Sequence, residues 1–194
     1  MDIKDKKYLT KGKRSLVYVG ILNNKKVAIK EQRTDIFAKN TINKEADFLK
    51  ILNKHKIGPK LINSSNNKII YDFVEGILII PFLESKRPQK KVLLKILDQC
   101  FILDSLKINK EEMHNPYKHI LINRSKVRMI DFERCHYTNK PKNVTQFCQF
   151  LMSNKIYSLL ENKFDKDKLK KLLINYKENP SKTNFNKIKK IVFN

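Results

Sequence analysis

Two charged side chains fall on otherwise apolar elements, at a spacing that could bring them together. Lys30 directly follows Val27-Ala28-Ile29, a run with the β-branched composition of a packed strand. Glu45 shares a helical stripe with Ile42 and Leu49. A buried ammonium or carboxylate needs an opposite charge beside it. We therefore expect Lys30 and Glu45 to form an ion pair; the alternative is that Glu45 lies at the margin of the stripe and reaches solvent.

Groups that could move a proton or bind a metal gather in the polar segment Glu111–His119. The imidazole of His114 could accept a hydroxyl proton, because the ordinary pKa of a histidine side chain is about 6.5. The carboxylates of Glu111 and Glu112 are alternative bases and could also orient a hydroxyl. A rival interpretation of the same region is a zinc site. Its ligands would be His114, His119, Cys135 and His136, although their spacing is unusual for zinc.

The elements that must position these residues begin with a β-rich segment. Three strands are expected within Tyr8–Gln32, interrupted by the basic turn 11–15 and by a hairpin turn at Asn23-Asn24-Lys25. The apolar stripe around Glu45 predicts a helix from about Asn40 to Lys54. Two further strands are expected over 60–62 and 69–74 before Glu75-Gly76 breaks the pattern.

The second half of the chain is predicted to be mainly helical. Its apolar periodicity and turn residues indicate a helix, a polar loop, a hairpin and three more helices. The predicted ranges are the helix 89–107, the loop 111–119, the hairpin strands 120–122 and 127–130, and the helices 145–160, 166–177 and 182–191.

The order of these parts resembles the protein-kinase-like fold. Val27-Ala28-Ile29-Lys30 resembles the kinase strand that ends in a phosphate-binding lysine, and Asp131-Phe132-Glu133 resembles the metal-binding Asp-Phe-Gly element with Glu in place of Gly. The likeness covers roughly residues 8 to 160. It is closest to small atypical archaeal kinases near the RIO group, which have a loop like Pro116-Tyr117-Lys118-His119. It implies a minimal two-lobed α+β fold, with an N-lobe over 1–76 and a C-lobe over 77–194.

The resemblance also implies roles in binding ATP and Mg²⁺. Lys30 would contact the phosphates, Glu45 would position Lys30, and Asp131 would hold the metal. The turn between the first two strands would lie over the phosphates, unless it is a plain basic hairpin, and the segment near residue 75 would bind the adenine edge. The cofactor-binding residues predicted beyond Lys30 and Glu45 are Lys11, Gly12, Lys13, Ser15, Phe73 and Glu75.

The predicted catalytic loop departs from the kinase pattern. The position that holds a metal-binding Asn in kinases is His119, and the position of the catalytic Asp is His114. The base is then Glu112, Glu111 or His114, and Lys118 would neutralise the transferring phosphoryl group. His119 is a poor ligand for Mg²⁺, which prefers oxygen. A second metal is therefore absent, or Mn²⁺ serves better.

These features lead to one preferred function and two alternatives. The preferred prediction is an ATP-dependent phosphotransferase that acts on Ser or Thr of a protein. The first alternative is a small-molecule kinase of the same fold. The second is a nucleotide-binding pseudokinase or ATPase that docks RNA or the ribosome, an alternative that the missing loop Asp favours.

The composition bounds the partners and the compartment. With 42 Lys and Arg against 19 Asp and Glu, the net charge of +23 favours polyanions such as ATP, RNA, ribosomes or acidic proteins. The alternative is a merely solvated Lys-rich surface. Three scattered cysteines indicate reduced thiols, the first residues lack the apolar core of a signal peptide, and no stretch approaches the roughly 20 apolar residues of a membrane span. We expect a cytoplasmic protein without membrane contact.

Overall fold

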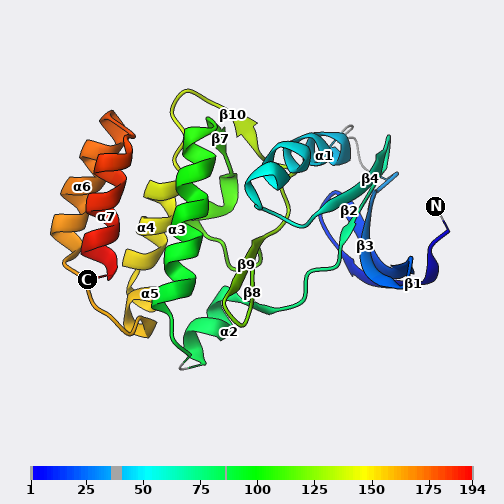
Figure 1. The fold of residues 1–194 in the computed structure, drawn as a ribbon, viewed down its shortest axis with the longest axis horizontal. Coiled ribbons are helices and arrows are strands. Elements are labelled where there is room, and N and C mark those ends of the chain that lie inside the picture. The colour runs from blue at the N-terminus through cyan, green and yellow to red at the C-terminus, as the bar shows by residue number, and fades with distance from the viewer. Residues whose placement is uncertain (1, 36–40, 86, 194) are drawn as a thin grey trace. The chain divides into compact units, whose positions relative to one another are not determined.

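The computed structural model describes residues 2–35, 41–85 and 87–193. Within them the chain is α+β: seven α-helices accompany a five-stranded antiparallel sheet and two small sheets (Figure 1). The chain divides into two compact units, each described by itself below. Unit 1 comprises Met1–Glu75 and Arg128–Arg134, and unit 2 comprises Gly76–Val127 and Cys135–Asn194. Residues 128–134 were predicted to belong to the second lobe, whereas the structure groups them with unit 1.

Unit 1 is built on the five-stranded sheet, whose spatial order is β1-β2-β3-β5-β4. Its strands are β1 (Lys4–Lys11), β2 (Ser15–Leu22), β3 (Lys25–Gln32), β4 (Leu61–Ser65) and β5 (Lys68–Asp72). The predicted hairpin turn between β2 and β3 consists of Asn23 and Asn24, whose φ angles of 49° and 59° are left-handed. Asparagine tolerates this conformation, which two-residue hairpin loops require.

Helix α1 (Thr41–Leu52) packs against β3, β4 and β5. Because side chains alternate along a strand, Val27 and Ile29 of β3 face one side, in a cluster with Leu22 and Ile70. The residues between and after them, Ala28 and Lys30, face α1. The short 3₁₀ helix η1 (Asn53–His55) follows α1. Asn40, where the predicted helix begins, lies outside the described residues.

Unit 2 contains most of the helices. They are α2 (Ile79–Glu84), α3 (Lys90–Ser105), α4 (Asn143–Met152), α5 (Asn154–Leu159), α6 (Lys166–Glu178) and α7 (Lys182–Phe193). The small sheets have the order β6-β8-β9 and β10-β7. Their strands are β6 (Ile77–Leu78), β7 (Ile108–Asn109), β8 (Ile120–Asn123), β9 (Lys126–Met129) and β10 (His136–Tyr137). The chain passes from unit 2 into unit 1 within β9.

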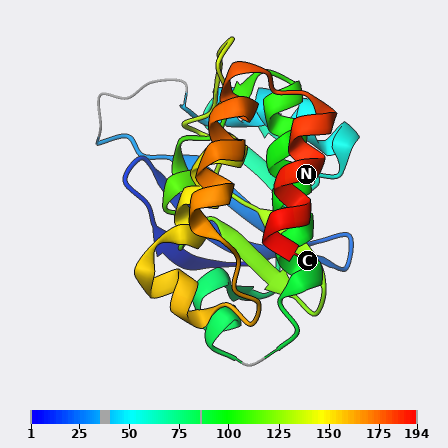
Figure 2. The same ribbon diagram turned by 90° about the vertical axis from the view of Figure 1, so that its left-hand side faces the viewer.

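The core of unit 2 lies among its longer helices. Helix α3 packs against α4 and α7, and α6 packs against α7 and α4. Figures 1 and 2 both show α6 and α7 running side by side. Phe101 of α3 and Phe185 of α7 stack with their ring centroids 4.2 Å apart. These contacts bury the apolar stripes that predicted α3, α6 and α7 from the sequence.

Several short elements differ from the predictions. The single helix expected over 145–160 is two helices, because Ser153 is extended (φ −60°, ψ 141°) between α4 and α5. The apolar run 77–83 forms β6 and most of α2. Within the loop 111–119, residues Glu111–His114 form the 3₁₀ helix η2. Strands β7 and β10 were not predicted.

In the parts of the chain that the structure describes, no helix has both the length and the apolar composition needed to cross a bilayer.

Candidate functional site

The predicted ion pair between Lys30 and Glu45 is confirmed. The Lys30 ammonium donates a hydrogen bond of 2.7 Å to Glu45 Oε2, from β3 to α1. Both side chains are buried, with 5% and 1% of their surface exposed. Separating the two groups would leave an unpaired charge in the interior, which would be strongly destabilising.

Two further carboxylates reach the same ammonium. Lys30 Nζ lies 2.8 Å from Asp131 Oδ1 and 3.4 Å from Glu133 Oε2. Glu133 also lies 3.7 Å from the guanidinium of Arg14. From the sequence, Glu133 was interpreted only as a replacement for the glycine of the kinase element. Its acidic type, two residues after Asp131, was the one signal in the sequence that could have placed it here.

The backbone around Asp131 is fixed in an uncommon conformation. Asp131 has a φ of 64°, in the left-handed region that only a few non-glycine residues adopt. The next amide, that of Phe132, donates to Glu45 Oε1 at 3.1 Å. Glu45 therefore uses one oxygen for Lys30 and the other for Phe132. This arrangement ties the Asp131 backbone to α1 and directs the Asp131 carboxylate at Lys30.

The ionisation of the cluster follows from burial and from the excess of carboxylates. Burial by itself would lower the pKa of Lys30, but Glu45 and Asp131 outweigh it and hold that pKa well above its ordinary value. Burial raises the pKa of Glu45, and Lys30 offsets only part of this effect. Burial and the Glu45 carboxylate likewise raise the pKa of Tyr71. The carboxylates of Glu45, Asp131 and Glu133 thus share the Lys30 ammonium.

The carboxylates are arranged so that they could hold a metal ion. Glu45, Asp131 and Glu133 each offer an oxygen, and these oxygens lie within 4.8 Å of one another. Carboxylate oxygens suit Mg²⁺ and Mn²⁺. Both oxygens of Glu45 are already hydrogen-bonded, whereas Asp131 keeps 34% and Glu133 11% of the side chain exposed. Asp131 and Glu133 are therefore the two residues that could ligate a cation.

The predicted histidine ligands belong to unit 2, whereas the carboxylate cluster belongs to unit 1. Within the described ranges, Glu45, Asp131 and Glu133 are the only grouping of three or more metal-ligating side chains. The alternative zinc set of His114, His119, Cys135 and His136 is accordingly not assembled. His119, predicted to ligate a metal beside Asp131, belongs to unit 2.

Arg33 donates hydrogen bonds to backbone carbonyls of the basic turn between β1 and β2. The Gly12 amide donates to the Ser15 carbonyl at 2.8 Å, and Arg33 Nη1 donates to the Lys13 carbonyl at 3.2 Å. Lys11 and Lys13 are exposed, whereas Ser15 is buried. Of the predicted turn residues, the two lysines thus present charge to solvent, and Ser15 has a structural place on β2.

Part of the predicted adenine-binding segment contacts the sheet of unit 1, because Phe73 interacts with Lys26 of β3. The Phe73 amide donates to the Lys26 carbonyl at 3.2 Å, and the Lys26 ammonium lies 4.0 Å from the centroid of the Phe73 ring. Phe73 is half-buried and Glu75 is exposed. Phe73 therefore has its backbone donor engaged within unit 1.

The predicted catalytic loop lies in unit 2, where it separates the candidate bases. Lys110 is fully buried and donates to Glu112 Oε2 at 2.9 Å, so Glu112 belongs to a buried ion pair. Glu111 Oε1 lies 3.3 Å from His136 Nδ1. The side chains of His114 and Lys118 are exposed. Glu111, His114 and Lys118 thus reach solvent, while Glu112 is committed to the interior.

No protein-family model matches the sequence, and no curated protein matches it.

Proposed function

We propose that the chain is an ATP-dependent phosphotransferase, a protein kinase of atypical type that acts on Ser or Thr. The observation that supports it best is the Lys30 ammonium held between Glu45 and Asp131, at 2.7 and 2.8 Å. A lysine in this setting is rigid, fully charged and next to carboxylates that suit a divalent cation. These are the groups needed to bind a magnesium–triphosphate complex.

In this proposal each residue of the cluster has one role. Glu45 keeps Lys30 oriented, and Lys30 contacts the phosphates. Asp131 and Glu133 would hold Mg²⁺ or Mn²⁺, and a bound cation would neutralise the charge that develops on the phosphates. Arg14 lies near Glu133 and adds positive charge at the margin of the cluster.

The finer assignment to a kinase-like, two-lobed fold rests on the order of the elements. The strand with Lys30, the helix with Glu45 and the hairpin before Asp131 follow one another as the resemblance requires. The acceptor site would use Lys118, with Glu111 or His114 as the base. Glu112 is a weaker candidate, because Lys110 already binds its carboxylate.

The departure of the loop 111–119 from the kinase pattern favours a second candidate function, a protein that binds Mg–ATP without transferring phosphate. The loop has no Asp at the catalytic position, and one of its two glutamates is buried in an ion pair. In that case the cluster in unit 1 would still bind nucleotide. Turnover by wild type, measured with Mg²⁺ and then Mn²⁺, separates the two functions.

The first experiment is to measure Mg–ATP affinity calorimetrically for wild type and Lys30→Met. We expect a loss of about tenfold to a hundredfold, because one charge-assisted phosphate contact contributes roughly 1.5–3 kcal/mol. Lys50→Met is the matched control: Lys50 is exposed on α1 and pairs with Asp47 at the surface. Equal affinity in wild type and the folded Lys30→Met variant would refute the proposal.

A further inference from the structure

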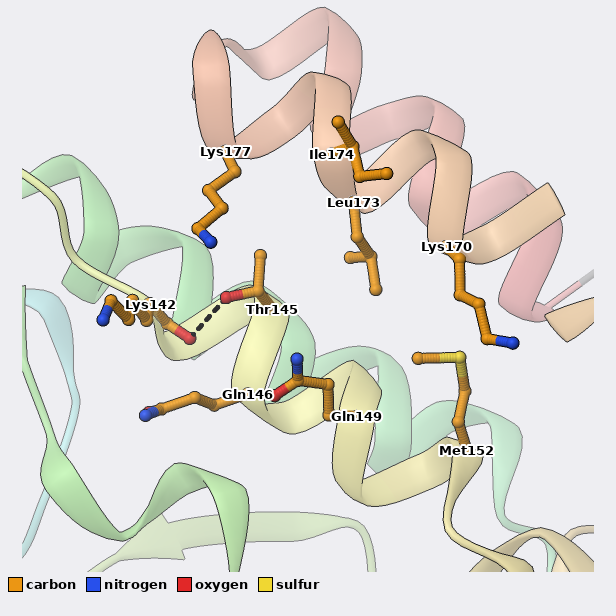
Figure 3. A pocket seen from close by; sticks show the side chains of 9 residues that line it. All are labelled: Lys142, Thr145, Gln146, Gln149, Met152, Lys170, Leu173, Ile174 and Lys177. Atoms are coloured by element: carbon orange, nitrogen blue, oxygen red, sulfur yellow. Dashed lines mark hydrogen bonds between the residues drawn. The ribbon is translucent and has the colours of Figure 1, made fainter. Parts of the chain in front are cut away.

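A groove of about 550 Å³ lies between α4 and α6, within unit 2. Figure 3 shows side chains of the two helices facing each other across it. Its lining residues are Lys142, Thr145, Gln146, Gln149, Met152, Lys170, Leu173, Ile174 and Lys177. The volume lies in the range of sites that take a small ligand or a few side chains of a partner.

The charge of the groove has a single sign. Three of the lining residues are lysines, and none is acidic. Lys142 and Lys177 lie toward one end, and Lys170 lies beside Met152 at the other (Figure 3). Lys170 pairs with Asp167 at 3.0 Å, but that pair is exposed and weak. Across the described residues, no carboxylate lies within ion-pair distance of Lys142 or Lys177. An anionic ligand is therefore favoured at both ends.

Between the lysines the groove is aliphatic. Leu173 is buried, Met152 is half-buried, and Ile174 of α6 keeps 58% of its surface exposed. An exposed isoleucine in a groove gains free energy when a partner covers it. The groove therefore offers an apolar anchor point flanked by cations.

The α4 side of the groove also carries polar side chains, among them Thr145 and Gln146. Gln146 Oε1 is buried and has no hydrogen-bond partner. The hydroxyl of neighbouring Thr145 already donates to the Lys142 carbonyl at 3.0 Å (Figure 3).

We propose that the α4–α6 groove docks an acidic segment of a partner protein, with an aliphatic side chain seated on Ile174 and carboxylates flanking it near the lysines. The lining offers neither an aromatic ring for base stacking nor an arginine, which disfavours RNA as the occupant. A second copy of the chain is disfavoured because both partners would carry +23. The groove requires no nucleotide, so this docking stands apart from the proposed transfer reaction.

The test begins with a display library of random short peptides selected on the full chain at physiological salt. Selected sequences should combine Asp or Glu with Leu, Ile, Val or Met. Replacing the aliphatic residues of a selected peptide by serine, at unchanged charge, should weaken its binding about tenfold, the loss expected for one buried aliphatic side chain. Selection of peptides without this pattern, or binding unaffected by the serine replacement, would overturn the proposal.

Variants then place the peptide on the protein. The double change Lys142→Glu with Lys177→Glu should lower the affinity for the selected peptide by about tenfold or more. The control is Lys187→Glu with Lys190→Glu, an equal change of charge at exposed positions of α7. Ile174→Ser should also weaken binding, whereas Leu9→Ser on exposed β1 should not. Equal losses for both lysine pairs, or displacement of the peptide by a single-stranded RNA oligonucleotide at the same salt, would contradict docking of an acidic segment.

Discussion

Three carboxylates gather around the buried ammonium of Lys30. Glu45, Asp131 and Glu133 all lie within ion-pair distance of one buried ammonium, and the guanidinium of Arg14 lies 3.7 Å from Glu133. Like charges this close raise each other's cost of ionisation unless a cation joins them. The left-handed backbone of Asp131 is a further cost that surrounding structure must hold in place. Both features are common at sites that bind a charged ligand, where binding relieves them.

Glu133 gives the sharpest single-residue prediction for the metal. Glu133→Gln should weaken Mn²⁺ binding in the presence of ATP by about tenfold, because a charged ligand oxygen is lost. Stability should change by less than about 1 kcal/mol, since Lys30 keeps both Glu45 and Asp131. Titration of bound Mn²⁺ by electron paramagnetic resonance measures the affinity, and urea unfolding measures the stability.

The matched control for this prediction is Glu31→Gln. Glu31 lies on β3 like Lys30, but it pairs with exposed Lys6 at 2.9 Å. The Glu31→Gln substitution should leave the affinity for Mn²⁺ unchanged. An unchanged affinity in Glu133→Gln would remove Glu133 from the metal site and leave Asp131 as its sole predicted ligand.

The residues of the site were predictable to different degrees. Lys30 and Glu45 could be paired from the sequence because each charge interrupts an apolar pattern, and burial then demands a partner. The place of Asp131 followed from resemblance alone. The commitment of Glu112 to Lys110 could not be foreseen, because it depends on the burial of a lysine in a segment that reads as a polar loop.

Among the elements, the N-terminus of α4 is held by a residue from another helix. Asp104, near the end of α3, accepts hydrogen bonds from the backbone amides of Asn143 and Val144 at 2.9 and 3.2 Å. It also accepts from the Asn143 side chain and from the Tyr176 hydroxyl of α6. The first amides of a helix have no partner within the helix and favour negative charge. Asp104 therefore links α3, α4 and α6 through one buried carboxylate.

Replacing Asp104 by asparagine should destabilise unit 2. The amide group can accept at only one atom, so its nitrogen would face either the two donors of Asn143 or the Val144 amide and the Tyr176 hydroxyl. We expect a loss of about 1–3 kcal/mol in the free energy of unfolding. Urea unfolding followed by circular dichroism measures it. Asp98→Asn on the same helix is the control, because Asp98 makes a partly exposed pair with Lys189 and should cost less than about 1 kcal/mol. Equal costs for the two variants would show that the Asp104 contacts add no stability.

Long elements were predictable because their periodicity is repeated over several turns, as in α3, α6 and α7. The short ones depend on contacts that the sequence does not display. β7 and β10 are two residues each and exist through pairing across the chain, with His136 opposite Asn109. The break at Ser153 interrupts an apolar stripe that continues on both sides, so periodicity alone predicted one helix.

On the scale of the whole molecule, the net charge of +23 is spread over many elements rather than gathered in one RNA-binding motif. Exposed lysines occur on β1, whose eight residues are all exposed, and along α6 and α7. A diffuse charge of this kind attracts any polyanion at low salt through release of counterions. It gives no preference for sequence, because base edges must be contacted for that.

Single-stranded RNA should therefore bind weakly and without sequence preference. We expect the affinity to fall steeply with salt, with a log–log slope of about −0.7 for each phosphate neutralised. The dissociation constant at physiological salt should be about 10⁻⁴–10⁻⁶ M. Fluorescence polarisation with uridine and adenosine oligonucleotides over a salt series measures both quantities. An acidic peptide docked on Ile174 should lose less affinity over the same series, because burial of its aliphatic side chain is not screened by salt. RNA binding that is flat in salt, or that strongly favours one oligonucleotide, would show instead that part of the basic surface is a specific nucleic-acid site.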